Sequence, residues 1–397
     1  MRLHANLVEG VAVTLFEIFQ NGRYADKAIQ YTLKSNKRWG SRDRSFVAES
    51  VYEIVRWYRL FYEVRTLEPQ SVKDWYQMFA IYWLSKGGEL PEWNEFRHLN
   101  QATLLGRLER ISKLESKESI PDWLHELGQK ELKKNWPETI HALNKRAPIV
   151  LRVNTLKIER KELKAALEKE KIFTYPFGES ALILKKRANV FGTEAFKKGY
   201  FEVQDASSQE VAAFADIKPG MRVVDTCAGA GGKTLHLAAL MQNKGQLIAT
   251  DIHEWKLAEL KKRARRAGAS NIQIRPIVKS QVYKRLFNTA DRVIIDAPCS
   301  GLGVLRRNPD SKWKLKPEFI ENIKDTQKEL LDKYCQIAKK DGILTYITCS
   351  ILPSENQEQI QAFLARNDQF ELIEEKSLLP QDFGFDGFYM AKLRRTK

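Results

Sequence analysis

The sequence of 397 residues predicts a multidomain protein that combines a helical N-terminal domain, a small α+β module and a C-terminal α/β domain. Its length exceeds that of one typical domain, about 100–200 residues. Apolar residues recur at helical spacing through the first third of the chain, whereas short apolar runs alternate with helical segments in the second half. We therefore place the domains at residues 1–145, 146–215 and 216–397.

The first domain, residues 1–145, is expected to be helical because its apolar side chains follow a helical repeat. The clearest helix spans residues 41–60, where Ser41 and Asp43 can cap the first turn. Residues 1–19 carry a similar apolar stripe that two glutamates interrupt, a pattern unlike that of a signal peptide. Since no apolar run reaches the ~18 residues of a spanning helix, we expect no membrane segment.

A small α+β module follows from residue 146, where the pattern changes at Ala147 and Pro148. Short apolar runs predict strands, and one amphipathic stretch predicts a helix between them. The expected strands cover residues 149–154, 181–184 and 200–203, and the expected helix covers residues 159–169. We expect these elements to pack as one α+β unit.

The last domain, residues 216–397, alternates strand, loop and helix. The expected strands are residues 221–225, 246–251, 271–278, 292–296 and 342–348, and the expected helices are residues 233–242, 254–267, 317–340 and 354–366. Apolar strands that alternate with helices predict a parallel sheet covered on both faces. Ligands of such sheets bind beyond the carboxyl ends of the strands, so we expect the chemistry there.

The charge balance points to a polyanionic partner, because 66 Lys and Arg residues outnumber 50 Asp and Glu residues and give a net charge of +16. Solubility alone is the other explanation of this surplus of positive charge. With 43% hydrophobic residues the chain can bury ordinary cores, which excludes global disorder.

Four cysteines occur, and their spacing excludes a disulfide framework and a zinc knuckle, because none forms a CxxC pair. We expect reduced thiols in a cytoplasmic protein and no bound metal. Cys335 lies inside an expected helix and is expected to be a small buried apolar residue. Cys299 and Cys349 differ from it, since each follows a strand in a polar turn.

A glycine-rich loop follows the first strand of the α/β domain at residues 226–234 and allows a ligand to approach the backbone closely. Its candidate ligand-binding residues are Cys227, Ala228, Gly229, Ala230, Gly231, Gly232 and Lys233. The loop lacks the first glycine of a phosphate-binding P-loop and the third glycine of a dinucleotide fingerprint. An NTPase stays open as an alternative, because residues 292–296 are similar to a Walker B strand.

The second strand of this domain ends in Asp251, which can accept hydrogen bonds from both hydroxyls of a ribose. A glycine loop after the first strand and an acid after the second fit a nucleoside cofactor such as S-adenosylmethionine. The alternative is that Asp251 only caps the helix that follows.

Cys299 and Cys349 each follow a strand and are expected at the same edge of the sheet, beside the cofactor loop. C5 of a pyrimidine is a poor nucleophile, and a thiolate that adds to C6 enables C5 to accept a methyl group. Asp296, which precedes Cys299, can stabilise the adduct at N3 of a cytosine. A second thiol near C5 can assist loss of the C5 proton and release of the first thiol.

Six motifs in the second half of the chain resemble RNA cytosine-C5 methyltransferases of the RsmB/Sun/NOP2 type. The motifs are Arg-Val-Asn-Thr-Leu-Lys at 152–157, Gln-Asp-Ala-Ser-Ser-Gln at 204–209, the loop at 225–234, Asp-Ala-Pro-Cys-Ser-Gly at 296–301, Thr-Cys-Ser at 348–350 and Asp-Gly-Phe-Tyr-Met-Ala at 386–391. The resemblance covers residues 148–397 and is to the bacterial ribosomal RNA branch.

The resemblance implies a Rossmann-like, class I S-adenosylmethionine-dependent methyltransferase domain and a NusB-like RNA-binding domain at residues 1–145. It implies that Cys349 is the nucleophile and that Cys299 assists product release. It also implies that residues 227–233, Asp251 and Asp296 line the cofactor site. In one departure, residues 277–280 lack the acid that the family often has after the third strand.

Basic residues near the thiols and in the small module are candidates for RNA binding. They are Arg306, Arg307 and Lys312 after the Cys299 motif, and Arg152 and Lys157 in the module. Trp313 lies within the first group and can stack a base. The alternative for that segment is a solvated surface loop with Trp313 packed beneath it.

We therefore predict an S-adenosylmethionine-dependent enzyme that makes 5-methylcytosine in 16S ribosomal RNA of the small subunit, as a cytoplasmic monomer. Transfer RNA is an alternative substrate. A non-catalytic RNA-binding or ribosome assembly factor that retains this fold is an alternative function. Charge is expected to set affinity, so RNA binding should weaken steeply with salt.

Overall fold

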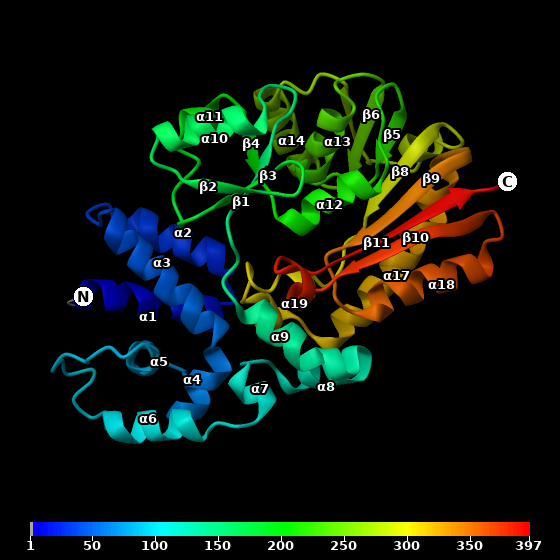
Figure 1. Ribbon diagram of the computed structural model, residues 1–397. Helices are drawn as coiled ribbons and strands as arrows, with labels where there is room; N and C mark the ends of the chain where they lie inside the picture. The colour runs from blue at the N-terminus through cyan, green and yellow to red at the C-terminus, as the bar shows by residue number, and fades with distance from the viewer. Residues whose placement is uncertain (1–2) are drawn as a thin grey trace. The chain divides into compact units, whose positions relative to one another are not determined.

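The computed structural model describes residues 3–397, and the chain divides into two compact units (Figure 1). The helical unit contains the chain up to Asn144 together with residues 307–315. The second unit contains residues 145–306 and 316–397. The sequence placed residues 307–315 in the α/β domain, whereas their packing places them in the helical unit.

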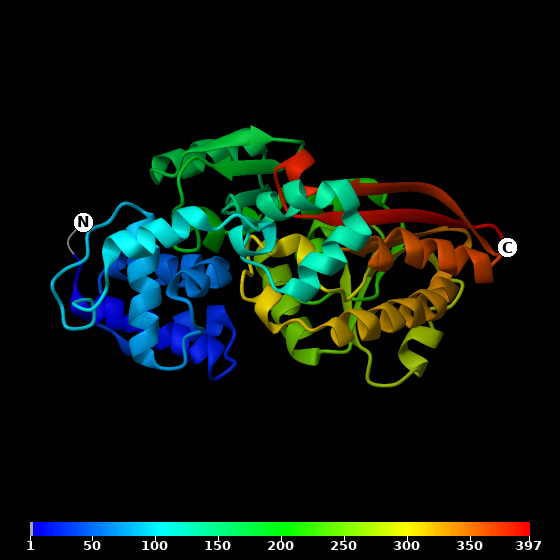
Figure 2. The same ribbon diagram turned by 90° about the horizontal axis from the view of Figure 1, so that it is seen from below.

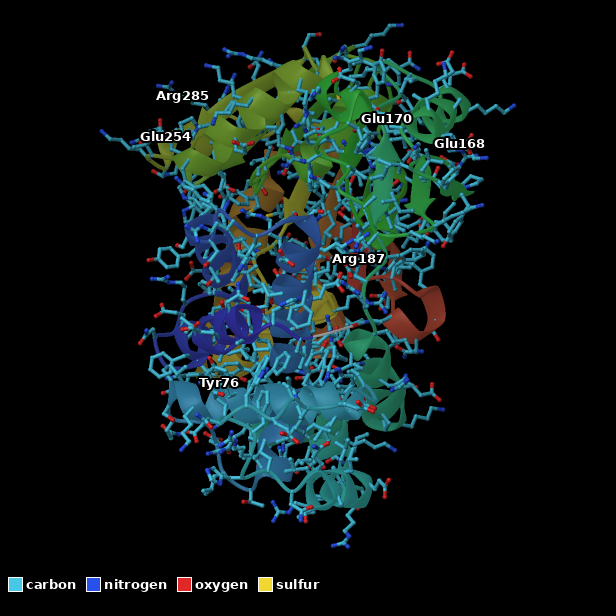
Figure 3. The ribbon with its side chains drawn as sticks, turned by 90° about the vertical axis from the view of Figure 1, so that its left-hand side faces the viewer. Tyr76, Glu168, Glu170, Arg187, Glu254 and Arg285 are labelled. Atoms are coloured by element: carbon cyan, nitrogen blue, oxygen red, sulfur yellow. The ribbon has the colours of Figure 1, made fainter. Side chains whose placement is uncertain are left out.

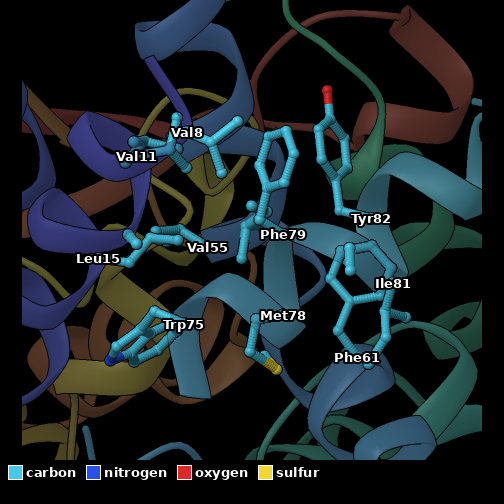
Figure 4. Packing of buried hydrophobic residues seen from close by; sticks show 14 of the residues in the cluster. Val8, Val11, Leu15, Val55, Phe61, Trp75, Met78, Phe79, Ile81 and Tyr82 are labelled. Carbon is cyan, nitrogen blue, oxygen red and sulfur yellow. The ribbon is translucent and has the colours of Figure 1, made fainter. Parts of the chain in front are cut away.

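The helical unit is built from amphipathic helices around an aromatic core (Figure 4). Val8, Val11 and Leu15 of one helix are fully buried, as are Trp75 and Phe79 of another. The helices are α1 (Ala5–Phe19), α2 (Ala25–Ser35), α3 (Ser41–Arg56), α4 (Tyr58–Arg65), α5 (Val72–Ser85), α6 (Gln101–Arg110), α7 (Leu114–Lys117), α8 (Asp122–Leu132) and α9 (Trp136–Asn144).

The helix expected at residues 41–60 is interrupted at one residue. Trp57 has φ −106° and ψ 26°, outside the helical range, so α3 ends at Arg56 and α4 starts at Tyr58. The apolar repeat continues across this break, and both helices therefore pack into the same core. Periodicity alone could not locate the interruption.

Residues 307–315 belong to the helical unit because their polar side chains bond its backbone. The short helix α16 (Ser311–Lys314) carries Lys312, whose Nζ donates to the Arg56 carbonyl at 2.9 Å. The Trp313 indole donates to the Val55 carbonyl at 2.7 Å, and Asp310 accepts from the Ala25 amide at 3.0 Å. These bonds satisfy carbonyls and amides that the helices leave unpaired at their ends.

The small module folds as an antiparallel sheet in the order β2-β3-β1-β4. Its elements are β1 (Val150–Val153), α10 (Arg160–Lys169), β2 (Thr174–Phe177), β3 (Ala181–Leu184), α11 (Glu194–Lys197) and β4 (Phe201–Val203). The sequence missed β2, because only Thr174 of this edge strand is buried and Pro176 weakens the strand pattern.

The larger sheet has seven strands in the order β10-β11-β9-β8-β5-β6-β7. Its strands are β5 (Arg222–Asp225), β6 (Gln246–Asp251), β7 (Ile272–Pro276), β8 (Ala290–Asp296), β9 (Ala338–Thr348), β10 (Phe370–Leu378) and β11 (Phe388–Arg395). Strands β5 to β9 pair in parallel, but β11 pairs with β9 and β10 in antiparallel fashion. The parallel pairing expected for the five predicted strands is therefore confirmed, and the two antiparallel strands, β10 and β11, were not among the strands predicted.

Helices cover both faces of this sheet. One face packs against α17 (Pro317–Tyr334) and α18 (Gln357–Arg366), which run along the strands in Figure 2. The other face packs against α12 (Ala206–Phe214), α13 (Gly232–Leu240) and α14 (Glu254–Ala267). The remaining short helices are α15 (Gln281–Lys284) and α19 (Pro380–Phe383).

The helix expected at residues 317–340 ends earlier, at Tyr334. Cys335–Ile337 forms a single 3-10 turn, and Ala338 already begins β9. The carbonyls of Gln336 and Ile337 accept hydrogen bonds from Asn288 and Thr289, which lead into β8. This long-range pairing with a neighbouring strand overrides the local helical pattern. Cys335 is buried, with 4% of its surface exposed.

Candidate active site

The candidate residues of the α/β domain meet at one edge of the large sheet. Because β6, β5, β8 and β9 are parallel neighbours, their carboxyl ends lie together. The glycine loop follows β5, Asp251 ends β6, Asp296 ends β8 and Cys349 follows β9. The structure thus brings the expected cofactor residues and both expected thiols to the same place.

The glycine loop needs glycine at position 231. Gly231 caps α13 with φ +87°, in the left-handed region, and a Cβ there would lie 2.1 Å from Leu260 Cδ1 of α14. Gly229 also has a positive φ, +53°, and its amide donates to Asp251 Oδ2 at 2.9 Å. This bond fixes the loop against the end of β6.

Asp251 contacts more than the following helix. Its Oδ1 accepts from the His253 amide at 2.7 Å, as a local turn residue would, and its Oδ2 accepts from Gly229. The carboxylate therefore holds the glycine loop and the start of α14 together. Each oxygen keeps a second lone pair with which to accept from a ribose hydroxyl.

The loop residues fit S-adenosylmethionine. A Cβ built on Gly229 or Gly232 meets no atom within 4 Å, so a ligand can approach the backbone there. Ile252 and Val278, just after the ends of β6 and β7, are 69% and 76% exposed. Apolar side chains at these positions can flank an adenine ring without the acid that is missing from residues 277–280.

Lys233 at the start of α13 forms an ion pair with Asp296. Its Nζ lies 2.7 Å from Asp296 Oδ2, and Asp296 remains partly exposed. Burial lowers the pKa of Lys233, but the Asp296 carboxylate outweighs it, so the net pKa is raised and the ammonium stays charged. The pair joins the glycine loop to the loop that carries Cys299.

Asp225 lies beneath this pair and is fully buried. Thr234 Oγ1 donates to its Oδ2 at 2.7 Å. Burial, together with the nearby charge of Asp296, raises the pKa of Asp225 to about 7. The carboxyl therefore changes its charge close to neutral pH.

Cys299 and Cys349 are free thiols whose sulfur atoms lie 3.4 Å apart. One thiol can donate a hydrogen bond to the other at this separation. The hydrogen bond to Cys349 and burial raise the pKa of Cys299 well above its usual range. Cys227, in the glycine loop, also has a raised pKa because of burial.

The Cys349 loop is held close to the last strand of the sheet. The Cys349 carbonyl accepts from the Gly303 amide at 2.9 Å, and the Gly303 carbonyl accepts from the Gly387 amide at 2.8 Å. A Cβ on Gly303 would lie 2.2 Å from the Gly387 carbonyl oxygen, so this approach requires glycine. Through this contact the motif at residues 386–391 lies beside the loops of the two thiol motifs.

Three of the expected RNA-binding residues are instead buried structural residues. Arg152 is 2% exposed and donates to the Gly232 carbonyl at 2.6 Å, which links the small module to the glycine loop. Arg306 is 4% exposed and donates to the Gly384 carbonyl at 2.6 Å. Lys312 is 1% exposed, and burial lowers its pKa well below the usual range. None of these three presents its charge to solvent.

The other two basic candidates are more accessible. Lys157 is exposed, although its Nζ donates to the carbonyls of Lys198 and Arg266. Arg307 is partly buried in the helical unit. Charged side chains of both signs project from the small module, including Glu168, Glu170 and Arg187 in Figure 3. Basic residues on this module therefore alternate with acidic ones.

The sequence reasoning missed Glu355. It is fully buried in a 3-10 turn after Cys349 and contacts the loops of both thiols. A carboxylate seven residues after a strand end carries no motif of its own. Its only sequence signal is its place between two functional loops of the fold.

Comparisons with known proteins identify the family. A family model described as 16S rRNA methyltransferase RsmB/F matches residues 212–394, and a ferredoxin-like domain model of RsmF/B-like methyltransferases matches residues 120–191. The protein of Bacillus subtilis (strain 168) named "Probable ribosomal RNA small subunit methyltransferase B" is 30% identical, over 96% of this chain and 97% of its own length. The chain belongs to the RsmB/F family of methyltransferases.

Other RsmB/F relatives and solved structures agree with this result. Ribosomal RNA small subunit methyltransferase B of Escherichia fergusonii is 36% identical, over 69% of this chain and 66% of its own length. A methyltransferase homolog from Pyrococcus horikoshii has a TM-score of 0.63 at 27% identity, covering 71% of this chain and 97% of that one. PH0851 has the same fold throughout, with a TM-score of 0.82 at 24% identity and all of both chains covered.

Membership in the RsmB/F family makes the protein an S-adenosylmethionine-dependent methyltransferase, and the NTPase alternative falls away. When bound, S-adenosylmethionine supplies an electrophilic methyl group, and residues 227–233 and Asp251 remain the residues predicted to hold it. Among residues 3–397, no helix is long and apolar enough to cross a membrane.

Proposed function

We propose that this RsmB/F protein methylates C5 of a cytosine in 16S ribosomal RNA through a covalent bond between Cys349 and C6 of the base. The observation that carries the proposal is the 3.4 Å separation of the Cys299 and Cys349 sulfurs, beside the glycine loop. Acceptor groups that are already nucleophilic need no enzyme thiol. A carbon such as C5 becomes nucleophilic only after addition at C6.

The first step is addition of the Cys349 thiolate to C6. The C5–C6 double bond opens, and its electron pair becomes available at C5. C5 then bonds the methyl carbon while the bond from that carbon to the cofactor sulfur breaks and the neutral thioether leaves. Asp296 has one oxygen bonded to Lys233, and its other oxygen can accept from N3–H of the adduct. N3 takes up a proton from water as the thiolate adds and returns it when the adduct breaks down, and the nearby carboxylate stabilises this N3–H.

The second step removes the C5 proton and releases the enzyme. Cys349 carries no charge once it is bonded to C6, so Cys299 no longer lies beside an anion and can lose its proton to water. The Cys299 thiolate then takes the C5 proton, the C5–C6 double bond forms again, and Cys349 leaves as a thiolate. The two thiols thus exchange roles during one turnover.

The RNA substrate follows from the relatives and from the geometry of the base. Relatives in Vibrio cholerae and Escherichia fergusonii are named ribosomal RNA small subunit methyltransferase B, which favours 16S ribosomal RNA over transfer RNA. Stacking in an RNA helix covers the faces of the base, so the target cytosine must be unpaired or flipped out. We propose that the protein acts as a monomer in the cytoplasm, where its thiols stay reduced.

We propose three functional parts: residues 1–145 as an RNA-binding domain, residues 146–215 as an RNA-binding module and residues 216–397 as the catalytic domain. The net charge of +16 supports binding of a polyanion. Exposed basic residues such as Lys157, rather than the buried ones, would then contact phosphates. Binding should weaken steeply as salt rises.

Incubation with S-adenosylmethionine labelled in its methyl group tests the proposal. The purified protein is given deproteinised 16S ribosomal RNA, assembling 30S particles or transfer RNA, and the product is read by bisulfite sequencing. We expect label in one 16S cytosine and none with Cys349→Ala. Label in adenosine or in ribose would overturn the chemistry, and label in transfer RNA alone would overturn the substrate. Absence of label in all three would favour a non-catalytic assembly factor.

A further inference from the structure

Glu355 is a buried carboxylate that bonds the loops of both thiols. It ends the 3-10 turn Pro353–Glu355, six residues after Cys349, and 0% of its surface is exposed. Burial of an ionised carboxylate is costly unless donors surround it. Its partners therefore indicate what the fold gains from keeping it there.

Two of these partners belong to the loop that carries Cys299. The Ser300 amide donates to Glu355 Oε2 at 2.8 Å, and the Ser300 hydroxyl donates to Oε1 at 2.5 Å. Gln327 of α17 donates to Oε2 at 2.9 Å and to the Pro298 carbonyl at 3.0 Å. The residues on both sides of Cys299 are thus fixed relative to Glu355.

A further partner belongs to the loop that carries Cys349. The Ser350 hydroxyl donates to Glu355 Oε1 at 2.5 Å, and it also lies 3.2 Å from the Ser300 hydroxyl. The Tyr346 hydroxyl, on β9, donates to the Glu355 carbonyl at 2.8 Å. One carboxylate therefore bridges the residue that follows each thiol.

The donors to the carboxylate are amides and hydroxyls, so they leave its negative charge in place. That charge adds to the hydrogen bond from Cys349 and to burial in raising the pKa of Cys299. The carboxylate therefore disfavours loss of a proton from Cys299.

We infer that Glu355 is a positioning residue that holds the two thiols at contact distance and places a negative charge beside the loop of Cys299. The titratable groups that act on Cys299 are Cys349 and Glu355, with the neutral Tyr346 phenol packed against them. The positioning role itself does not depend on the proposed function. Only its consequence for catalysis, the choice of nucleophile, rests on that function.

The charge effect is tested without RNA or cofactor. The two thiols are alkylated with iodoacetamide over a range of pH, and each cysteine is quantified by mass spectrometry. In Glu355→Gln, we expect the Cys299 profile to move by about one pH unit to lower pH, which is roughly tenfold more alkylation at a given pH. Glu358→Gln, which removes an exposed charge three residues away, should leave both profiles unchanged.

Glu355→Asp keeps the charge, so we expect its Cys299 profile to shift less than that of Glu355→Gln. An equal shift in the Asp and Gln variants would overturn the electrostatic role, because altered packing would then explain both. If folded Glu355→Gln showed the same Cys299 alkylation profile as the wild type, the electrostatic role would also be overturned. Because neither readout involves methyl transfer, a failure of the proposed cytosine chemistry would leave these results standing.

The positioning effect has its own test, which avoids changing the carboxylate. Diamide oxidises the two thiols to a disulfide and is itself reduced by two electrons. Ser350→Ala removes one bond to Glu355, and we expect Cys299–Cys349 disulfide formation to slow by about tenfold, with unchanged circular dichroism. Disulfide formation at the wild-type rate in this variant would overturn the role of Glu355 in holding the loops together.

Discussion

Lys233 Nζ donates to Asp296 Oδ2 at 2.7 Å, so the first turn of α13 is bonded to the end of β8. The Phe388 ring lies 5.2 Å from the same ammonium. Lys233 thereby connects the glycine loop, the Asp-Ala-Pro-Cys motif and the last strand. A residue of the glycine loop thus orients the carboxylate that is proposed to meet the base.

Lys233→Met should lower the rate of methyl transfer by at least about a hundredfold, because Asp296 would lose the cation that fixes it. Single-turnover methyl transfer at saturating S-adenosylmethionine measures this effect. Lys244→Met removes an exposed lysine beyond the end of α13 and serves as the matched control. A Lys233→Met rate within twofold of wild type would contradict the proposed role of the pair.

Asp251→Asn should weaken S-adenosylmethionine binding by about 10–100-fold, since it replaces a charged acceptor of hydrogen bonds from ribose hydroxyls with a neutral one. Isothermal titration calorimetry measures the change in Kd. Glu254→Gln removes an exposed acid from the first turn of α14 and should bind normally. Equal affinities in the two variants would contradict the ribose contact.

Lys312→Met should affect stability more than RNA binding. It would leave the Arg56 carbonyl and the Asn144 Oδ1 without their donor, at a cost of about 1–3 kcal/mol in the free energy of unfolding. Urea unfolding and filter binding to 16S RNA measure the two properties. The exposed Lys316→Met is the control. A tenfold loss of RNA affinity at unchanged stability would show that this side chain contacts RNA after all.

Asp225 predicts a pH dependence of stability. Its pKa in the folded chain is about 7 against an ordinary value of 3.8, so folding favours the protonated form. The stability that it contributes is present below about pH 4 and is lost as pH rises to about 7. The lost free energy is on the order of 4 kcal/mol, at about 1.4 kcal/mol per pKa unit.

Asp225→Asn cannot ionise, so it should gain stability relative to wild type between about pH 5 and about pH 8. Urea unfolding of both proteins without cofactor at the two pH values measures this gain. The bond from Thr234 can persist to the Asn oxygen. A constant difference in stability between the two proteins would contradict the raised pKa of Asp225.

The sequence predicted the elements whose signal is local. The strand ends with Asp251, Asp296 and Cys349 were predicted within a few residues because buried strands and glycine loops carry their own patterns. The resemblance of six motifs then supplied roles for these residues. The position of both thiols at one edge followed from the parallel connection of β8 and β9.

The sequence could not predict features that depend on distant partners. In the sequence Lys312 resembles an exposed basic residue. Its ammonium instead donates to the Arg56 carbonyl at the end of α3, more than 250 positions earlier in the chain. In the sequence Glu355 resembles an ordinary surface acid, but in the fold it is fully buried beside both thiol loops. The end of α17 at Tyr334 likewise depends on pairing with the segment before β8. In each case tertiary contact overrides the local pattern.

The most direct test of the two-thiol account compares Cys299→Ala with Cys349→Ala. Each variant is incubated with 16S RNA and S-adenosylmethionine, and protein bound covalently to RNA is measured on a denaturing gel. We predict that Cys299→Ala accumulates a covalent complex, because Cys349 adds to C6 but is not released, and that Cys349→Ala forms none. A complex that requires Cys299 and forms without Cys349 would contradict the account.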